Sequence, residues 1–373
     1  MTHQFIHACA GSGKTQHIVD HCSEGATQNV QRLIITLTTS GQDELEQRLG
    51  KATNPLAATP EVTGWYLFLL NHIVRPYLPL LFRKHRVTGF IFDAGDARAR
   101  LRRIPKSNAR RYLSENDMVY KDYLEELAAE LMIKAGGLVE NRLALIYDEI
   151  IIDEAQDISR SGLDVIELLL RQDRFHCLLV GDSRQSLIDS SLSSRKNKKA
   201  DRENLLEWYR RFSREHRLKI IEKSETYRFN QSIADFSDTI FPKTLGFSPT
   251  VSRMKEETPH DGVFLVAQED LEQYFKTYGP TVLRASKASW RDREELTPIN
   301  FGISKGRTFH RVMILATKSI EDFCLKGKGL TSKSACGFYV AVTRARYSVA
   351  IVVQKTRKKL IETAPPELTI WMP

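Results

Sequence analysis

The sequence FIHACAGSGKT, residues 5–15, decides the fold class of this protein. Its first four residues are mostly apolar and predict a short buried strand, and residues 16–22 have the spacing of a helix. The segment between them is rich in glycine, and the backbone N–H groups of such a loop can surround phosphate oxygens. A strand, a phosphate loop and a helix in this order predict a nucleotide-binding α/β domain.

The residues of this loop have distinct expected roles. Lys14 would reach the β- and γ-phosphates, and the hydroxyl of Thr15 would bind Mg²⁺. Ala8 stands where the usual pattern begins with glycine. We expect the nucleotide to contact Ala10, Gly11, Ser12, Gly13, Lys14, Thr15 and Gln16.

A second segment, YDEIIIDE at residues 147–154, points to hydrolysis of the nucleotide. It is an apolar strand that places two acids at its carboxyl end. Asp153 can hold Mg²⁺ through water, and Glu154 can polarise an attacking water. The alternative is a buried strand that ends in a solvated acidic turn. Together with the phosphate loop, the two acids favour hydrolysis of ATP or GTP without a covalent intermediate.

Strand-like and helix-like segments alternate along the chain, which predicts an α/β fold with mostly parallel sheets. We expect a first block up to residue 219 and a second from residue 220, with surface loops at 195–202 and 252–261. The predicted strands are residues 5–8, 33–37, 145–152, 177–180, 263–266, 281–283, 311–316 and 348–353. The predicted helices are residues 16–22, 42–49, 162–170, 233–240 and 338–344.

Positive charge is concentrated in one part of the chain. The 373 residues carry a net charge of +9, and residues 75–111 alone contain eleven basic residues against Asp93 and Asp96. The rest of the chain is formally neutral. Such a local excess favours a surface that binds a polyanion, and the alternative is a solvated charged face.

The cysteines and the apolar segments exclude several classes of protein. The five cysteines form no CxxC pair, which fits a reducing compartment, so we expect a cytoplasmic protein without structural zinc. No apolar run approaches the length of a membrane helix, and the first ten residues do not resemble a signal peptide. Cys9 lies in the phosphate loop. It is either a redox-sensitive thiol or a small side chain that only fills space (a filler), and we favour the filler.

Several further segments occur in an order and spacing that single out one family. They are DEAQD (153–157), GDSRQS (181–186), ETYRFN (225–230), GISKGRTF (302–309), YVAVTRAR (339–346) and, more weakly, TLTT (36–39) and VTGW (62–65). Together with the phosphate loop they resemble the superfamily 1 helicases of the UvrD/Rep type over residues 5–353.

The resemblance implies ATP as substrate and Mg²⁺ as cofactor, bound in a cleft between two RecA-like lobes. By this resemblance Gln185 senses the γ-phosphate, Tyr227 stacks on the base, Arg228 approaches the γ-phosphate and Arg344 acts as an arginine finger. The implied catalytic residues are Lys14, Asp153, Glu154, Gln185, Arg228 and Arg344, and Tyr227 and Gly306 complete the nucleotide contacts.

The implied partner is single-stranded nucleic acid, for which we expect DNA and keep RNA as the alternative. The first lobe would span residues 1–219, with a basic and mainly helical insertion at residues 72–144, and the second lobe residues 220–373. The expected nucleic-acid contacts are Thr38, Thr39, Thr63, Trp65, Arg102, Arg103, Arg110, Arg111, Ser304 and Lys305.

The sequence departs from the family pattern at several places. Gln16 stands where the family often has arginine, and Thr308 where it commonly has glutamate; we also expect no upstream glutamine segment that reads adenine. Residues 186–190 lack the aromatic side chains on which relatives stack bases. Only residues 229–301 separate ETYR (225–228) from the segment GISKGRTF. This leaves little room for the large accessory domain that full-length relatives carry between these two motifs.

Two classes of function follow from these features. The first is an ATP-driven translocase or helicase on single-stranded nucleic acid, with 3′→5′ movement expected from the resemblance. The second is a nucleic-acid-stimulated ATPase that acts as a sensing component of a defence or repair complex, with a nuclease or toxin as its protein partner. An unrelated P-loop kinase is a weaker third option, because it would not need the segments around residues 227 and 344.

Overall fold

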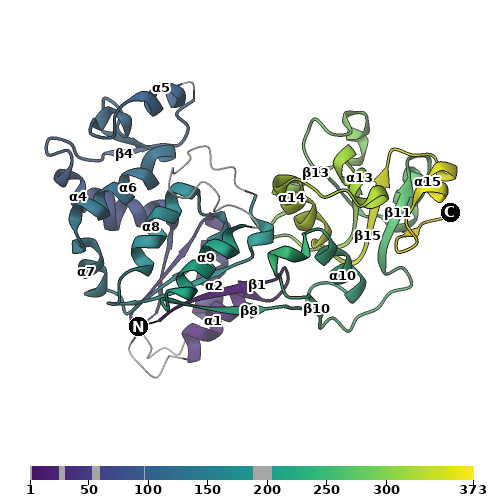
Figure 1. The fold of residues 1–373 in the computed structure, drawn as a ribbon, viewed down its shortest axis with the longest axis horizontal. Helices are drawn as coiled ribbons and strands as arrows, with labels where there is room; N and C mark the ends of the chain where they lie inside the picture. The colour runs from purple at the N-terminus through teal and green to yellow at the C-terminus, as the bar shows by residue number, and fades with distance from the viewer. Residues whose placement is uncertain (1, 25–29, 53–58, 96, 188–203) are drawn as a thin grey trace.

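The computed structural model describes residues 2–24, 30–52, 59–95, 97–187 and 204–373. These residues form two α/β lobes that lie side by side, the first on the left of Figure 1 and the second on the right. Residues 188–190 and the predicted loop at 195–202 lie outside the described residues. Among the described residues, no helix is long and apolar enough to cross a membrane.

The first lobe is built on a six-stranded sheet in the order β3-β2-β6-β7-β1-β8, and every pair in it is parallel. Its strands are β1 (His3–Ala8), β2 (Arg32–Thr36), β3 (Glu61–Gly64), β6 (Glu149–Ile152), β7 (His176–Gly181) and β8 (Leu218–Lys223). The predicted strand at 145–152 is shorter, since Leu145 caps helix α7 (Leu138–Ala144) and is 88% exposed.

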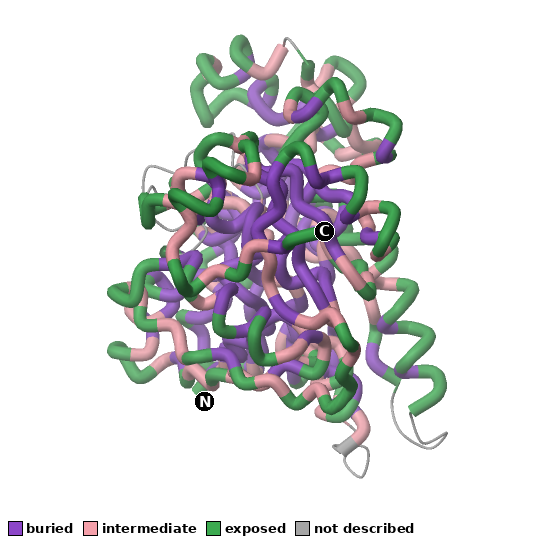
Figure 2. Tube along the Cα trace, turned by 90° about the vertical axis from the view of Figure 1, so that its right-hand side faces the viewer, coloured by how far each residue is buried: buried purple, intermediate pink, exposed green. Residues whose placement is uncertain are grey.

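Apolar residues line both faces of this sheet because successive side chains of a strand point to opposite sides. In β2, Leu33 and Ile35 join one buried cluster, and Ile34 joins another. The first cluster contains side chains of α6 (Lys121–Ala135), α8 (Arg160–Leu170) and α9 (Leu205–Arg214). The second contains side chains of α1 (Lys14–Glu24) and α2 (Thr39–Ala52). Helices therefore cover both faces, and Figure 2 shows the buried segments gathered through the middle of the molecule.

The second lobe repeats this plan. Its sheet has the order β13-β12-β14-β15-β11-β16, again with parallel pairs throughout. The strands are β11 (Gly262–Ala267), β12 (Thr281–Arg284), β13 (Ile299–Asn300), β14 (Phe309–Leu315), β15 (Ala345–Val353) and β16 (Thr369–Ile370). The helices are α10 (Gln231–Thr239), α11 (Leu271–Tyr278), α12 (Phe301–Ser304), α13 (Lys318–Lys326), α14 (Ser332–Val342) and α15 (Arg357–Thr363). Two parallel sheets flanked by helices confirm the predicted fold class.

The two lobes meet near a short pair of strands. Strands β9 (Glu225–Thr226) and β10 (Val251–Ser252) pair just after β8 ends. Because β8 pairs with β1 over its whole length, residue 220 lies inside the first sheet. We therefore propose a lobe boundary after Lys223 instead of between residues 219 and 220.

The segment between β3 and β6 is mainly helical and rises above the first lobe in Figure 1. A pair of short parallel strands also belongs to it. Besides α6 and α7, its elements are α3 (Trp65–Phe68), α4 (Arg75–Tyr77), β4 (Gly89–Ile91), α5 (Ala97–Arg103) and β5 (Met118–Tyr120).

Part of the positive charge of residues 75–111 is neutralised within the protein. Helix α6 carries three acids at intervals of four residues, a spacing that places them on one side of the helix. The ion pairs are Arg98 with Asp122 at 2.7 Å, Lys106 with Glu126 at 3.1 Å and with Glu130 at 2.5 Å, and Arg111 with Glu126 at 2.8 Å. Three of the eleven basic residues therefore help to hold the insertion together.

The predicted nucleic-acid contact at Arg111 is wrong. Its side chain is buried, pairs with Glu126 and donates to the carbonyl oxygens of Arg102 and Ile104 at 2.8 and 2.7 Å. These acceptors surround the guanidinium, so it stabilises the turn after α5 and does not face a ligand.

We expect Arg111→Ala to lower the free energy of unfolding by about 3 kcal/mol, because the carboxylate of Glu126 and two carbonyl groups lose their donor. The matched control is Arg110→Ala, since Arg110 is the exposed neighbour, and its effect should stay within about 0.5 kcal/mol. Urea denaturation of both variants measures the difference. Equal stabilities would contradict the structural role of Arg111.

Candidate active site

The phosphate loop is shaped by two glycines in the left-handed conformation. Gly11 has φ +75° and Gly13 has φ +76°, values that only glycine adopts without strain. A Cβ at Gly11 would also lie 2.5 Å from Oγ1 of Thr226 and 2.6 Å from Cβ of Arg228. The loop therefore packs directly against the segment that enters the second lobe.

Two side chains of this loop lack partners among the described residues. The buried Oγ of Ser12 has no hydrogen-bond partner there, and Lys14 forms no ion pair with any described carboxylate. Helix α1 begins at Lys14, so its amino end also faces the loop. Free donors at a helix amino terminus fit an anion such as a phosphate group. Gln16 differs from Ser12 and Lys14, because its side chain already has partners: it donates to Asp20 and accepts from Arg48.

The two acids after β6 have different environments. Asp153 is 5% exposed, and burial together with the charge of Glu154 raises its pKa. Burial would also raise the pKa of Glu154, but the positive charges of Lys305 and Lys14 outweigh it and lower that pKa. Glu154 is thus the acid that stays ionised and can accept a proton from water. Its backbone has φ +52°, an uncommon conformation for a side chain other than glycine.

The donor set fits Mg²⁺ as the sequence predicted. Thr15 supplies a hydroxyl oxygen and Asp153 a carboxylate oxygen, which are ligands that this ion prefers. A cation would also relieve the repulsion between Asp153 and Glu154. Thr15 and Asp153 would therefore hold the ion, and bound Mg²⁺ would neutralise charge on the phosphate oxygens.

A buried network connects the lobes through Asp182, a residue to which the motifs assigned no role. Asp182 is fully buried and accepts hydrogen bonds from Arg184 at 3.1 Å, from Gln185 at 2.9 Å and from the hydroxyl of Tyr339 at 3.2 Å. The backbone N–H of Ala10 donates to the same tyrosine oxygen. Asp182 and Tyr339 lie inside the segments GDSRQS (181–186) and YVAVTRAR (339–346), but only the tertiary structure brings them together.

Two arginines of the second lobe converge beside this network. Nη2 of Arg344 donates to Oε1 of Gln185 at 3.0 Å, and Nη1 of Arg228 donates to the carbonyl oxygen of Thr343 at 3.2 Å. Burial and the charge of Arg228 lower the pKa of Arg344 to about 9. Neither arginine forms an ion pair with a carboxylate of the described residues. Arg344 is buried and Arg228 is half-buried, so two positive charges without a counterion among the described residues form a site that an anion would stabilise.

Lys305, predicted to contact nucleic acid, lies instead at the acidic end of β6. Its Nζ pairs with the carboxylate of Asp157 and lies 3.6 Å from Oε2 of Glu154. The side chain is 18% exposed. Lys305 therefore forms an ion pair across the lobes, which corrects the predicted role.

Other predicted nucleic-acid contacts divide into accessible and buried residues. Thr38 and Thr39 follow strand β2 and are exposed. Thr63 lies near the end of the neighbouring strand β3 and is half-buried. Trp65 is wholly buried and donates from Nε1 to Oε1 of Glu125 at 2.8 Å, so its predicted contact is wrong. The same holds for Ser304, which is fully buried and donates to the carbonyl of Phe301.

The remaining candidates surround the phosphate loop and Arg344. Tyr227 is 61% exposed, and its N–H donates to the carbonyl of Gly11, so its ring is accessible beside the loop. Gly306 has φ +81° and precedes Arg307, whose carbonyl oxygen accepts from Arg344. Burial raises the pKa of the Cys9 thiol to about 12, which agrees with a filler and not with a reactive thiolate.

We expect Arg344→Ala to lower ATP turnover about 10³-fold, because charge developing on the transferred phosphoryl group loses a preorganised partner. The matched control is Arg346→Ala, two positions along the chain, where the guanidinium pairs with Glu256 at the surface. Phosphate release by the two purified variants measures the effect. Wild-type turnover in Arg344→Ala would contradict a catalytic role.

Two curated relatives share part of this sequence, and each is one subunit of an ATP-dependent helicase/nuclease. That of Oenococcus oeni is 24% identical over 133 residues, 36% of this chain and 10% of the relative. That of Limosilactobacillus fermentum is 28% identical over 113 residues, 30% of this chain and 8% of the relative. The matched parts thus span about a tenth of the length of these relatives.

Among solved structures, the chain is similar to arterivirus nonstructural protein 10, a helicase in complex with DNA. The TM-score is 0.47 and the identity 15%, over 94% of this chain and 60% of the viral chain.

The similarity to helicase sequences confirms the resemblance that the motifs predicted. A family model described as "AAA domain" matches residues 2–190, which include the phosphate loop, the acidic strand and Gln185. Because this match covers half of the chain, the protein belongs to the AAA domain family.

Proposed function

We propose that this protein is an ATP-dependent translocase or helicase on single-stranded nucleic acid, with DNA as the expected strand and 3′→5′ as the expected direction. The observation that carries the proposal is that Arg228 and Arg344 of the second lobe contact the phosphate loop and Gln185 of the first lobe, respectively. Arg228 lies against Gly11, and Arg344 binds Gln185. These two cations come from the second lobe and lie at its interface with the first, which supports binding of a nucleoside triphosphate between the lobes.

The residues of this site have complementary roles in hydrolysis. Lys14, Arg228 and Arg344 would offset the negative charge of the phosphate groups. Glu154 would orient and deprotonate the attacking water, since Lys305 and Lys14 keep it ionised. Gln185 would sense the γ-phosphate. Its amide N–H donates to Asp182 and its amide oxygen accepts from Arg344, so it joins the two lobes at this site.

Hydrolysis would change how tightly the lobes are held. The phosphate loop belongs to the first lobe and the arginines to the second, so the triphosphate bridges them. Loss of the γ-phosphate weakens this bridge and favours opening. If both lobes bind one strand, repeated closure and opening moves the protein along it.

The nucleic-acid strand would bind where accessible polar and basic residues remain. Thr38, Thr39 and Thr63 provide polar groups at the carboxyl ends of two neighbouring strands. Arg102, Arg103 and Arg110 are exposed and form no ion pair with a described residue, unlike Arg98, Lys106 and Arg111 in the same segment. Such free cations suit contacts with phosphates of the backbone.

The burial of Trp65 favours a second candidate function. With this ring in the core, the one aromatic residue among the expected nucleic-acid contacts cannot stack on a base, and weaker binding of the strand would limit unwinding. The protein would then be a strand-stimulated ATPase that senses nucleic acid for a partner such as a nuclease or toxin. Displacement of a duplex by the protein alone, starting from a 3′ overhang, would favour the helicase over the sensor.

We expect Glu154→Gln to reduce ATP turnover at least 100-fold while nucleotide binding and thermal stability persist, because the amide cannot accept a proton from water. The matched control is Glu46→Gln, an exposed position on α2. Phosphate release in the presence of single-stranded DNA and binding of a fluorescent ATP analogue give the two readouts. A Glu154→Gln variant with wild-type turnover would refute the proposed mechanism.

We expect the triple change Arg102→Ala, Arg103→Ala and Arg110→Ala to weaken binding to single-stranded DNA and to flatten its salt dependence. Each lost phosphate contact should reduce the slope of log K against log salt by about 0.7. A control with the same loss of charge is the triple change Lys219→Ala, Lys243→Ala and Lys276→Ala, all exposed in the structure. Fluorescence anisotropy across a salt series measures both. If the two triple variants had equal salt slopes, the strand would bind at a surface other than the one formed by these arginines.

A further inference from the structure

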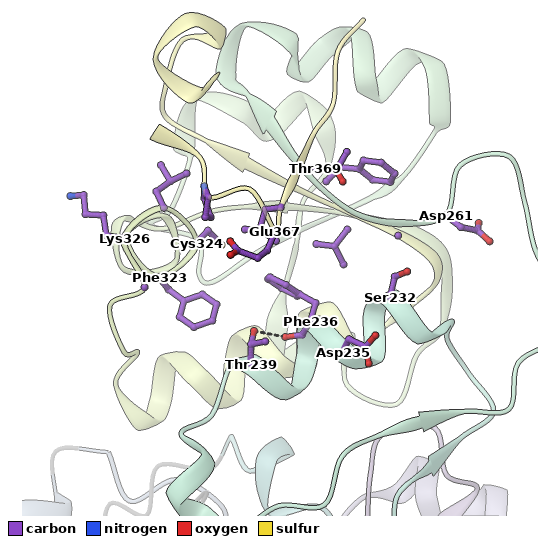
Figure 3. Close-up of a pocket in the computed structure, with 17 residues that line it drawn as sticks. Ser232, Asp235, Phe236, Thr239, Asp261, Phe323, Cys324, Lys326, Glu367 and Thr369 are labelled. Atoms are coloured by element: carbon purple, nitrogen blue, oxygen red, sulfur yellow. Dashed lines mark hydrogen bonds between the residues drawn. The ribbon is translucent and has the colours of Figure 1, made fainter. Parts of the chain in front are cut away.

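The second lobe contains a pocket that is separate from every residue assigned above to ATP or nucleic acid. It has a volume of about 920 Å³, within the range of roughly 300–1,000 Å³ that is typical of binding sites. Its walls come from α10, the first strand residues of β11, the carboxyl end of α13 and residues 365–369 near the end of the chain (Figure 3).

Aromatic side chains form the interior of this pocket. The rings of Phe236 and Phe323 lie 6.4 Å apart between centroids, and Figure 3 shows both directed into the space between α10 and α13. Phe264 of β11 also borders the pocket, but its half-buried ring stacks on His260 at 4.2 Å and packs with the apolar cluster on the other face of the sheet. Such rings can cover the aliphatic part of an incoming side chain and can attract a cation to their faces.

The charges of the pocket are negative, although the chain as a whole carries +9. Asp235, Asp261 and Glu367 line it, and none of them forms an ion pair with a described lysine or arginine. Within the described part of the chain, Asp235 and Asp261 accept hydrogen bonds only from neutral groups, those of Gln231 and Thr258.

One cation, Lys326, also belongs to the lining. Its Nζ binds Asp322 at 2.8 Å on its own helix, and Lys318 and Lys328 share this carboxylate, so three acids of the lining stand against one lysine. The same helix, α13, ends at the pocket, where Gly327 has φ +62° and terminates it. A helix carboxyl end carries partial negative charge, which adds to that of the three acids.

We propose that this pocket docks a segment of a partner protein that carries lysine or arginine next to apolar side chains. The rings would bury the aliphatic stems and apolar neighbours, and the carboxylates would bind the cationic ends. The same carboxylates would repel the phosphates of nucleic acid, so the occupant differs from the strand that the first lobe would bind. The proposal rests on neither ATP hydrolysis nor translocation.

The test uses a fluorescein-labelled hexapeptide of alternating lysine and leucine, with a hexapeptide of alternating glutamate and leucine as the control probe. Anisotropy with the full chain should show the lysine peptide binding at least tenfold more tightly. Glu367→Lys should weaken that binding about tenfold, since one attraction becomes a repulsion. Glu362→Lys makes the same change of charge at an exposed site outside the lining, so it should alter the affinity less than twofold.

A second variant tests the pocket by its shape. Ser232 is exposed on α10 and lines the pocket, so Ser232→Trp should fill part of it and weaken peptide binding at least fivefold. Turnover of ATP should remain that of the wild type in Ser232→Trp and Glu367→Lys. Equal affinity of the wild type and both variants for the lysine peptide would overturn the proposal.

Discussion

The contact between the two lobes at Asp182 is the interaction on which the rest of the site depends. This carboxylate is fully buried, and burial alone would raise its pKa, but the positive charges of Arg184 and Lys14 keep its pKa well below the usual range. It therefore remains an anion that orients Gln185 and Tyr339. Through these two side chains, a first-lobe acid positions groups of the second lobe around the phosphate loop.

The same interface holds more positive charge than the protein itself compensates. Arg344 is buried and Arg228 half-buried, and neither has a carboxylate partner among the described residues, whereas Lys305 is paired with Asp157. A triphosphate would supply the missing negative charge, and its hydrolysis would remove part of it again. The stability of the closed interface would then depend on the state of the nucleotide, which is the physical basis of a motor or a switch. The acidic and aromatic pocket of the second lobe uses none of these residues, so it suits a different partner.

Much of the fold was predictable from the sequence because its causes are local. Glycines at 11 and 13, runs of apolar residues in strands and the pair Asp153 and Glu154 determine the loop, the parallel sheets and the acidic strand end. The family and most of the candidate residues around the phosphate loop follow from these segments and from the motifs. Strands β3, β8, β13 and β16 of the two large sheets were not predicted. Apart from β8 they have only two to four residues, and such short strands are specified mainly by the neighbours with which they pair.

Only the tertiary structure decided what each polar or aromatic side chain contacts. Trp65 and Arg111 have the residue types of nucleic-acid contacts, but burial against Glu125 and Glu126, far along the chain, makes them structural. Lys305 faces Asp157 across the lobes for the same reason. Sequence by itself determined the fold class and the phosphate loop, because these depend on local conformation and periodicity. The structure alone decided which charges are compensated, because that depends on pairs that only folding brings together.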